Sequence, residues 1–418
     1  MKITILTYGS RGDIQPFLAL AVGLQKAGHA VTLAAPQRFT AFISQHNLQC
    51  APLAGDPDEL SRMFNDAGRN PYRMVRSMQE HVFAIAPQVV KAARQALQGA
   101  DLLVHSFIFT TGAHSFGREL GIPDVSVQLF PMFAPTRAFP ATGAPQGMPS
   151  WLNYVSHRFS AQVFWQAGNM GYRRLRRLAP ADFPARVYWP FKPAPGRVTT
   201  PLVFAISPVV LANPPEWQRP QIHMPGYFFL ESPHYQPPDE LQRFLEAGEP
   251  PVCVTFGSMV HRAAERITTA ALAAIQATRQ RAVFLTGWGG WRPPKPPGNV
   301  LFLDGAPHDW LFPCCKLVLH HGGAGTTAAG LRAGLPTIVV PHAADQPFWG
   351  DRVKAIGAGP PPIPINQLSA DALEGALLAA DSDPIRSRAA QIGHLIRAED
   401  GVGQAIAIIE AHAKSWGS

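Results

Sequence analysis

The sequence predicts an α/β protein built from two doubly wound, Rossmann-like domains. The chain of 418 residues is too long for one ordinary hydrophobic core and suits two domains of about 200 residues each. Short apolar segments alternate with segments of helical spacing, which indicates parallel sheets covered on both faces. A proline-rich stretch at residues 213–225 interrupts this alternation, which then starts again, as expected for two domains joined by a linker.

The elements expected in the first half alternate regularly along the chain. Apolar residues recur at helical spacing from Phe17 to Leu24, and Gly28 ends that segment. The expected order is a strand at residues 3–7, a turn at 9–16, a helix at 17–27, a strand at 31–35, a helix at 84–97, a strand at 101–105, a helix ending at Glu119 and a strand at 125–129.

The second half restarts this rhythm. Strands are expected at residues 252–256, 282–286, 300–303, 316–320 and 337–340. The predicted division is a first domain at 1–212, a linker at 213–225, a second domain at 226–400 and a final helical segment at 401–418. Doubly wound sheets bind ligands at the carboxyl ends of their strands. We therefore expect the two crevices to face each other, with a ligand in the cleft between the domains.

Composition and charge exclude several classes of protein. No apolar run approaches the roughly 18 residues of a membrane-spanning helix, and the first run is too short for a signal peptide. The four cysteines lack metal or redox spacing, so we expect a reduced, cytoplasmic protein. We also expect a monomer. The net charge is +8, and residues 1–215 hold 20 Lys and Arg against 10 Asp and Glu. Such an excess of positive charge can attract nucleic acid, an anionic membrane surface or an acidic ligand, or it can simply keep the protein soluble. We expect no nucleic-acid partner.

The segment at residues 317–327, LVLHHGGAGTT, carries the sharpest chemical signal. An apolar strand ends in a glycine-rich turn that opens a helix, and the free N–H groups of such a helix terminus favour a phosphate or diphosphate. His321 adds a donor and Thr326 a hydroxyl. No Gly-Lys-Ser/Thr follows, so this is not the phosphate loop of an NTPase. The alternative is that the glycines only allow the strand and helix to pack closely.

Two further segments carry polar residues after strands. Asp13 lies in GSRGDIQP at residues 9–16, where a Rossmann fold places its dinucleotide loop, but the Gly-x-Gly-x-x-Gly pattern is missing. Asp13 is a candidate general base, or it caps the following helix. In HAADQP at residues 342–347, Asp345 and Gln346 bind vicinal hydroxyls of a sugar, or they only form a turn before Pro347.

These segments resemble the nucleotide-sugar glycosyltransferases of GT-B fold. The residues at 305–308, 321–326 and 345–346 follow one another as in the donor-binding signature of that family. Residues 9–13, 256–259, 286–289, 307–313 and 345–350 resemble, more narrowly, the sterol 3-beta-glucosyltransferases and their bacterial relatives that glycosylate glycopeptide antibiotics and other natural products. The resemblance spans nearly the whole chain. It implies two facing Rossmann-like domains with the active site between them, and a last helix, at about 403–414, that packs back on the first domain.

The resemblance implies a donor site in which His321 and the helix terminus behind it hold the diphosphate. Asp345 and Gln346 then hold the sugar hydroxyls, and Trp288, Ala306 and His308 border the base. No metal and no cofactor is implied, because the UDP-sugar is a co-substrate. The implied donor set is Ser10, Gly12, Ser258, Trp288, Ala306, His308, His321, Gly323, Gly325, Thr326, Asp345 and Gln346.

The resemblance also assigns Asp13 as the catalytic base. Plant members carry a catalytic His at this position, whereas the antibiotic and sterol enzymes carry Asp. Two positions depart from the plant pattern: Ser106 stands where the Asp partner of that His is found, and Ala329 replaces a Glu that binds the ribose. A carboxylate base needs no orienting carboxylate, so the first departure agrees with Asp13 acting directly. The second leaves uridine and thymidine donors both open.

The reaction implied is an inverting, metal-independent hexosyl transfer from a UDP-sugar, with UDP-glucose expected, to a hydroxyl of a small apolar acceptor such as a sterol, terpenoid or polyphenol. A non-transferring enzyme of the same fold, such as a 2-epimerase, and a dinucleotide-dependent oxidoreductase are the alternatives. Six apolar residues of the first domain line an acceptor pocket or belong to its core: Phe107, Phe109, Phe130, Met132, Phe133 and Phe139.

The stretch at residues 151–178 mixes large aromatic residues with five arginines. One interpretation is peripheral contact with an anionic membrane, with Trp151, Phe159 and Trp165 inserted at the interface and the arginines near the headgroups. The other is a solvated helix that walls the acceptor cleft.

Overall fold

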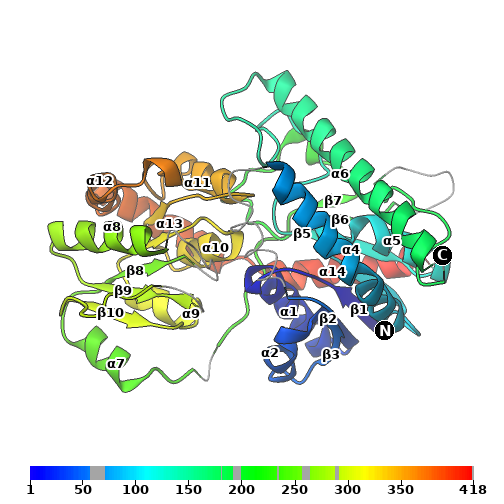
Figure 1. Cartoon of the computed structure of the whole chain (residues 1–418), viewed down its shortest axis with the longest axis horizontal. Helices are drawn as coiled ribbons and strands as arrows, with labels where there is room; N and C mark the ends of the chain where they lie inside the picture. The colour runs from blue at the N-terminus through cyan, green and yellow to red at the C-terminus, as the bar shows by residue number, and fades with distance from the viewer. Residues whose placement is uncertain are drawn as a thin grey trace. The chain divides into compact units, whose positions relative to one another are not determined.

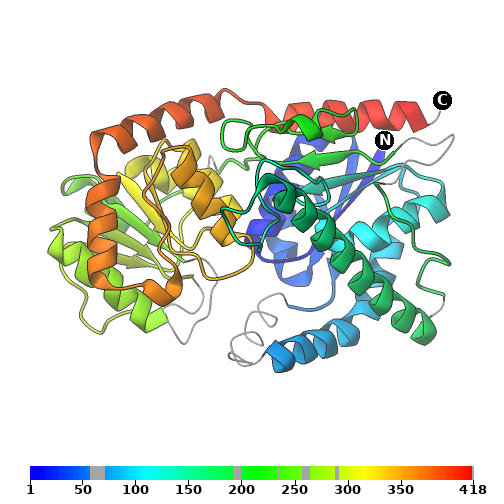
Figure 2. The ribbon, with the colours of Figure 1, turned by 90° about the horizontal axis from the view of Figure 1, so that it is seen from above.

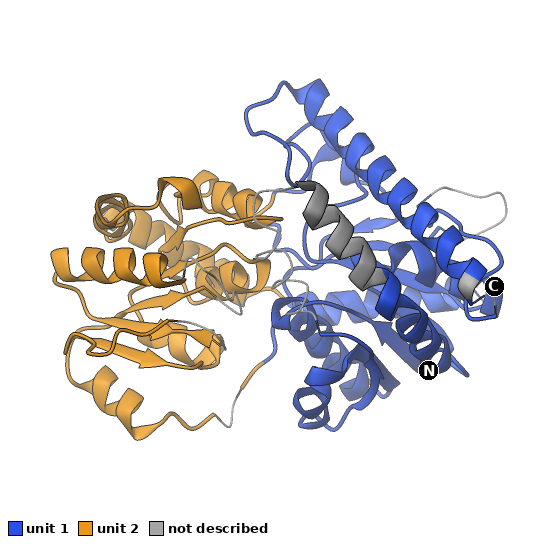
Figure 3. Cartoon of the chain, viewed as in Figure 1, with its two compact units in different colours: residues 1–208, 212–230, 400–418 blue, residues 209–211, 231–399 orange. Residues whose placement is uncertain are grey.

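A computed structural model of the chain describes residues 1–56, 71–179, 181–191, 199–232, 235–256, 264–287 and 291–416, and for residues 71–82 and Leu178 it describes the backbone only. The chain forms two compact units, which Figure 3 shows in different colours. The first unit comprises residues 1–208, 212–230 and 400–418, and the second comprises residues 209–211 and 231–399. Among the described helices, none is both long and apolar enough to cross a membrane.

The first unit is built on a parallel sheet of seven strands in the order β3-β2-β1-β4-β5-β6-β7 (Figure 1). The order reverses between β1 and β4, which creates the switch point of a doubly wound sheet. Its elements are β1 (Lys2–Leu6), α1 (Arg11–Lys26), β2 (Ala30–Pro36), η1 (Gln37–Phe39), α2 (Thr40–Ser44), β3 (Gln49–Leu53), α4 (Pro71–Ala96), β4 (Leu102–His105), η2 (Phe107–Phe109), α5 (Thr110–Leu120), β5 (Asp124–Gln128), α6 (Ser150–Leu178), β6 (Leu202–Phe204), η3 (Pro215–Trp217), β7 (Ile222–His223) and α14 (Gly401–Trp416).

Helices cover both faces of this sheet (Figures 1 and 2). Because successive strand residues point to opposite faces, Ile3 and Ile5 pack with α1 and α14 on one face, whereas Leu6 and Leu103 pack with α4 and α5 on the other. Helix α14 lies directly on α1, where a Cβ on Gly23 would collide with Val402. The last helix of the chain therefore belongs to the first unit.

The second unit has a five-stranded parallel sheet in the order β10-β9-β8-β11-β12. One face packs against α8 and α12, and the other packs against α7, α9 and α10. Its elements are α7 (Asp239–Glu246), β8 (Val252–Thr255), α8 (Ala264–Ala277), β9 (Ala282–Leu285), β10 (Val300–Leu303), α9 (His308–Leu311), η5 (Phe312–Cys314), β11 (Leu317–His320), α10 (Ala324–Arg332), β12 (Thr337–Val339), α11 (Gln346–Ala355), η6 (Ile365–Gln367), α12 (Ala370–Ala380) and α13 (Asp383–Arg397).

Two parts of the first unit differ from the sequence-based expectation. Helix α1 begins at Arg11, six residues before the expected start at residue 17, because Ser10 and Asp13 form a capping box that starts the helix within the predicted turn. The proline-rich residues 213–225 belong to the first unit, and the chain enters the second unit after Leu230. Within them, the Trp217 ring is buried and stacks on Phe204 at 4.6 Å, so proline richness here accompanies a segment packed on the first unit.

Candidate active site

Asp13 lies beside the carboxyl end of β1, at the switch point between β1 and β4. Its Oδ2 accepts hydrogen bonds from the Ser10 amide at 2.8 Å and from the Ser10 hydroxyl at 2.9 Å. Gly9 has φ of +144°, and a side chain there would collide with the Asp13 carboxylate. A glycine is therefore required directly under this carboxylate, in a conformation that other residues rarely adopt.

Only one oxygen of the Asp13 carboxylate takes part in the capping of α1. Oδ2 takes both bonds from Ser10, and the same side chain lines a small pocket. Burial raises the pKa of Asp13, and the two hydrogen bonds from Ser10 oppose that rise. A carboxylate whose pKa is raised above the ordinary Asp value is a stronger proton acceptor than an ordinary Asp, which suits a general base.

The pocket beside Asp13 is mostly apolar and aromatic. Phe107 and Phe130 belong to it as the sequence predicts, and their rings meet edge to face at 5.1 Å. The pocket is small, about 250 Å³ including space open to solvent, and its walls are aromatic and aliphatic around one carboxylate. The residues that line it are Tyr8, Asp13, Phe17, Ser106, Phe107, Val127, Leu129 and Phe130.

The other aromatic residues predicted to line the pocket do not line it in the structure. Phe133 is buried, and its ring contacts Phe164 of α6 at 5.1 Å. Phe139 is buried between His157 and Trp217. Phe109 packs against the core that α4 and α5 share. These three rings therefore belong to the packed interior, Phe133 and Phe139 against α6 and Phe109 against α4 and α5, which was the alternative that the sequence left open.

Ser106 follows β4 and shares the pocket with Asp13. Its side chain is buried, and within the described part of the chain its Oγ has no hydrogen-bond partner. An unpaired buried hydroxyl costs free energy unless a ligand or water completes it. Ser106 is therefore placed to hydrogen-bond a polar atom that enters the pocket.

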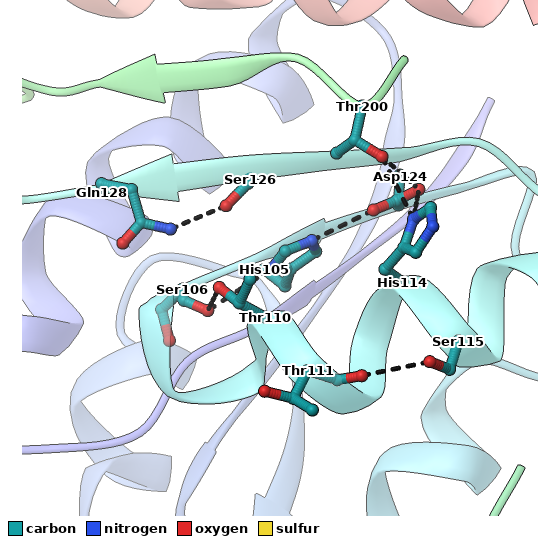
Figure 4. A network of polar contacts seen from close by, with 10 residues as sticks. All are labelled: His105, Ser106, Thr110, Thr111, His114, Ser115, Asp124, Ser126, Gln128 and Thr200. Atoms are coloured by element: carbon teal, nitrogen blue, oxygen red, sulfur yellow. Dashed lines mark hydrogen bonds and ion pairs between the residues drawn. The ribbon is translucent and has the colours of Figure 1, made fainter. Parts of the chain in front are cut away.

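A buried charge network lies next to Ser106, along β4, β5 and α5 (Figure 4). Asp124 accepts a bond from His105 at 3.2 Å and from His114 at 2.9 Å, and the Thr200 hydroxyl donates to it at 3.1 Å. Burial alone would raise the pKa of Asp124, but the hydrogen bonds and charges of the two histidines hold it well below its usual range. This ionised carboxylate fixes the segment that precedes the pocket residue Ser106.

The glycine-rich loop of the second unit connects β11 to the amino end of α10. His320 is buried, and its Nδ1 accepts a bond from the Gly322 amide at 2.9 Å. Gly322 has φ of +90°, and a Cβ there would lie 2.7 Å from Val339 and 3.0 Å from the Gln346 carbonyl oxygen. Gly322 therefore allows the chain to pack closely here, which was one of the two interpretations of these glycines from the sequence. It also brings the loop against the Asp345–Gln346 segment.

His321 projects from this loop at the amino end of α10. Burial lowers its pKa to about 4 and a hydrogen bond to the Thr255 backbone opposes that shift, so the imidazole is neutral at neutral pH and carries a single N–H. Among the described residues, no hydrogen-bond partner reaches its Nδ1. Gly323 is the N-cap, so the amides of the next residues, including Gly325 and Thr326, have no partner within the helix. The free amides at the amino end of α10, with this imidazole beside them, form a site for an anion such as a diphosphate.

The remaining predicted donor residues follow the neighbouring strands. His308 begins α9 and stacks on Phe312 at 4.4 Å, and its charge contributes to lowering the pKa of His320, so it lies near the glycine-rich loop. Ala306 packs against the core beside it. Ser258 and Trp288 lie outside the described residues.

Asp345 and Gln346 form the start of α11. Asp345 is its N-cap and accepts a bond from the Trp349 indole at 2.8 Å. The Gln346 side-chain oxygen accepts the amide of His342 at 2.8 Å, which shapes the preceding loop. Both side chains therefore stabilise the turn, and both are only half-buried beside the glycine-rich loop. The structure thus shows the turn-forming role that the sequence offered as the alternative to sugar binding, and this role does not exclude contacts with a sugar.

The sequence contains Asp-x-Asp at residues 56–58 and 381–383, a pattern that metal-dependent transferases use. Asp381 pairs with Lys316 at 3.1 Å, and Asp383 pairs with Arg386 at 2.5 Å, at the junction of α12 and α13. Asp56 pairs with Arg38 at 2.8 Å. Across the described residues, no three His, Cys, Asp or Glu side chains converge to hold a metal ion.

Comparison with known proteins identifies the family. The model of the glycosyltransferase family 28 N-terminal domain matches residues 3–114, and the model of the erythromycin biosynthesis protein CIII-like C-terminal domain matches residues 294–400. The chain is 34% identical to O-mycaminosyltylonolide 6-deoxyallosyltransferase of Streptomyces fradiae over 99% of its own length and 98% of that protein. The chain belongs to this glycosyltransferase family.

Other relatives of the glycosyltransferase agree on the class and the fold. A sterol 3-beta-glucosyltransferase of Arabidopsis thaliana is 33% identical over 99% of this chain, which spans 66% of that protein. The solved glycotransferase of kitacinnamycin has a TM-score of 0.72 at 17% identity and covers 99% of both chains. The SsfS6 glycosyltransferase of a Streptomyces species, solved with thymidine diphosphate, has a TM-score of 0.62 at 18% identity over 98% of this chain and 99% of that one. The fold is GT-B, with two Rossmann-like domains.

Sequence reasoning missed part of the site of this glycosyltransferase. The Ser106 hydroxyl was noticed only as a departure from the plant pattern, and Tyr8 and Phe17 were not predicted as pocket residues. Asp124 was not singled out, although an Asp at the start of an apolar strand is an unusual signal. His412 of α14, near the far end of the chain, also joins this network. Burial lowers the pKa of His412, and the negative charge of Asp124 opposes that shift.

Proposed function

We propose that this enzyme catalyses an inverting, metal-independent transfer of glucose from UDP-glucose to a hydroxyl of a small apolar acceptor, such as a sterol, terpenoid or polyphenol. The observation that carries the proposal is the position of Asp13, a half-buried carboxylate with a raised pKa in an apolar pocket at the switch point of the first unit. An acceptor in this pocket presents its hydroxyl to the one carboxylate that lines it.

In the proposed reaction, Asp13 takes the proton of the acceptor hydroxyl. The acceptor oxygen forms a bond to the anomeric carbon as the bond from that carbon to the diphosphate oxygen breaks. A single displacement inverts the configuration at the anomeric carbon. The carboxylate becomes a carboxylic acid, and the negative charge moves to the leaving diphosphate. Burial favours the neutral acid, so the environment of Asp13 assists this proton transfer.

The second unit supplies the donor side of the proposal. The amides at the start of α10 and the neutral imidazole of His321 face the place where charge develops on the diphosphate. In this role they replace a divalent metal as the stabiliser of the leaving group. Asp345 and Gln346, which pack against the same loop, are assigned to the sugar hydroxyls.

The names of the relatives support the acceptor class and the sugar. The Arabidopsis protein is named a sterol 3-beta-glucosyltransferase, and the Streptomyces fradiae protein is named an O-mycaminosyltylonolide 6-deoxyallosyltransferase. A sterol is apolar and carries a hydroxyl, in keeping with the aromatic pocket beside Asp13. A 2-epimerase needs no such pocket, and a dinucleotide-dependent oxidoreductase needs a glycine fingerprint that residues 9–16 lack.

Mass spectrometry of acceptor mixtures tests the proposal. The enzyme is incubated with sterols, terpenoids and polyphenols and with UDP-glucose, TDP-glucose or NADH. A product heavier by one hexose, formed with UDP-glucose and unaffected by EDTA, is the expected result. Interconversion of the sugar nucleotide without any acceptor product would support the epimerase instead. Loss of activity in EDTA, restored by a divalent ion, would overturn metal independence.

A further inference from the structure

Helix α6 carries a stripe of exposed apolar side chains along its outer face. Five of them are between 48% and 70% exposed: Trp151, Val155, Phe159, Val163 and Met170. Their spacing of four, four, four and seven residues keeps them on one side of a helix with 3.6 residues per turn. They make up half of the large apolar residues exposed in the described part of the chain. A clustered stripe of this kind marks a docking surface, whereas scattered single residues do not.

The same helix is basic, and most of its charge lies near its carboxyl end. Residues 150–178 contain five arginines and no acidic residue. Arg158 lies beside the stripe, and Arg173 and Arg177 continue it toward the end of the helix; all three are exposed. Among the described residues, none of the five arginines forms an ion pair with an acidic side chain. Apolar side chains flanked by cations match the chemistry of an anionic lipid surface.

The opposite face of α6 is packed into the first unit. Asn153, His157 and Leu175 are buried, and Phe164 contacts Phe107, which lines the pocket beside Asp13, at 5.6 Å. Trp165, one of the three residues expected to insert into a membrane, contacts Trp189 at 5.2 Å and is half-buried, so it does not belong to the outer stripe. The helix thus separates an inner, aromatic face near the pocket from an outer, apolar and basic face.

We propose that the outer face of α6 docks in the plane of an anionic lipid bilayer. Its five apolar side chains insert at the interface, and Arg158, Arg173 and Arg177 contact the headgroups. The purpose of docking rests on the proposed function, because apolar acceptors partition into bilayers and Phe164 links this helix to the acceptor pocket. A second copy of the chain fits this face poorly, since a symmetric contact would bring ten arginines together without one acidic residue on either helix.

Co-sedimentation of the full-length protein with vesicles tests the docking. The vesicles contain phosphatidylcholine alone or mixed with phosphatidylglycerol, and no sugar donor or acceptor is added. Binding to the mixed vesicles should exceed binding to phosphatidylcholine and should fall as salt rises. The triple change Arg158→Gln, Arg173→Gln and Arg177→Gln should weaken binding about 100-fold, at about fivefold for each arginine. The matched control changes three exposed lysines elsewhere, Lys26, Lys295 and Lys354, to Gln and should bind as the parent does.

Apolar variants separate insertion from charge attraction. Phe159→Ser with Met170→Ser should reduce binding at low salt, whereas Leu378→Ser with Leu395→Ser, which changes exposed leucines of the second unit, should not. Unchanged thermal unfolding of each variant shows that the fold is intact. Equal binding by parent and arginine variant, or no binding to the mixed vesicles at low salt, overturns the docking. A doubled mass in solution that Phe159→Ser abolishes would assign the face to self-association. Activity on dissolved acceptors is measured separately, so its absence counts against the proposed function only.

Discussion

The two binding regions of this enzyme are built from different parts of the chain. In the first unit, the site consists of side chains: the Asp13 carboxylate, the Ser106 hydroxyl and aromatic rings, with a buried histidine–aspartate network behind them. In the second unit, the site consists mainly of backbone: a glycine-rich loop and the amino end of α10, with one neutral histidine. Proton transfer requires a titratable side chain, whereas a diphosphate is bound well by N–H groups that every residue carries. Changes in the first unit should therefore affect chemistry and stability, and changes in the second should affect donor affinity.

The largest expected effect is on the stability of the first unit. Asp124→Asn leaves His105 and His114 without their shared carboxylate, and breaking such a buried pair costs about 3–5 kcal/mol in the free energy of unfolding. Urea unfolding measures the loss. Asp371→Asn, at an exposed position of α12, should change it by less than about 0.5 kcal/mol. An Asp124→Asn variant as stable as the parent would show that the network is not needed for folding.

This network also predicts the direction of acid sensitivity. The native pKa of Asp124 is below its value in the unfolded chain, so its contribution to stability is present above about pH 4 and is lost as the pH falls through the native pKa. The parent should lose stability below about pH 4 more steeply than Asp124→Asn does. Parallel curves for the two proteins would contradict the assignment.

The second effect concerns turnover. Asp13→Asn should reduce kcat by about 100-fold or more while UDP binding stays nearly the same, because the diphosphate is assigned to the amino end of α10 in the other unit. Burial raises the pKa of Asp13, so the ionised carboxylate is disfavoured in the folded protein at neutral pH, and the Asn variant should be at least as stable. A parallel loss of stability and activity would support a purely capping role.

The pH dependence of the reaction refines this prediction. Activity should fall as the pH drops through the pKa of Asp13, which lies above the ordinary Asp value. Because the Ser10 hydroxyl lowers that pKa, Ser10→Ala should move the acid limb of kcat/KM to higher pH. An unmoved acid limb would assign it to another group.

The third effect concerns the donor. His321→Ala should weaken UDP binding by about 1.5–3 kcal/mol, the range for a hydrogen bond to a charged group. Calorimetry measures this loss, which should stay constant across the neutral pH range because the pKa of His321 is about 4. Asp345→Ala should spare UDP yet weaken the intact sugar nucleotide. If both variants bind both ligands as the parent does, the donor assignment is wrong.

The smallest effect concerns the acceptor. Ser106→Ala should raise the acceptor KM by about 2–10-fold, as expected for the loss of one ordinary hydrogen bond, with UDP affinity and thermal unfolding unchanged. Stability should not fall, because the hydroxyl has no partner among the described residues. A destabilised variant with normal KM would show that the hydroxyl supports the fold rather than the ligand.

The two units also differ in how well their sequence predicts their site. LVLHHGGAGTT predicts a strand, a tight turn and a helix terminus from eleven adjacent residues, and β11 and α10 form as expected. In the first unit, six apolar residues were predicted to line the pocket, yet only Phe107 and Phe130 do so. A backbone anion site is local in sequence, whereas the wall of an apolar pocket depends on which face each ring turns toward.

Sequence alone determined the α/β class, the order of most strands and helices, the glycosyltransferase resemblance and the positions of Asp13 and the glycine-rich loop. These features arise from periodicity and from short motifs in which neighbouring residues act together. The tertiary structure decided that residues 213–225 pack on the first unit, that His105, His114, Thr200 and Asp124 share one buried network, and that α6 turns its arginines and five apolar residues outward. Such contacts join residues far apart in the chain, and they form only when the packing of whole elements brings those residues together.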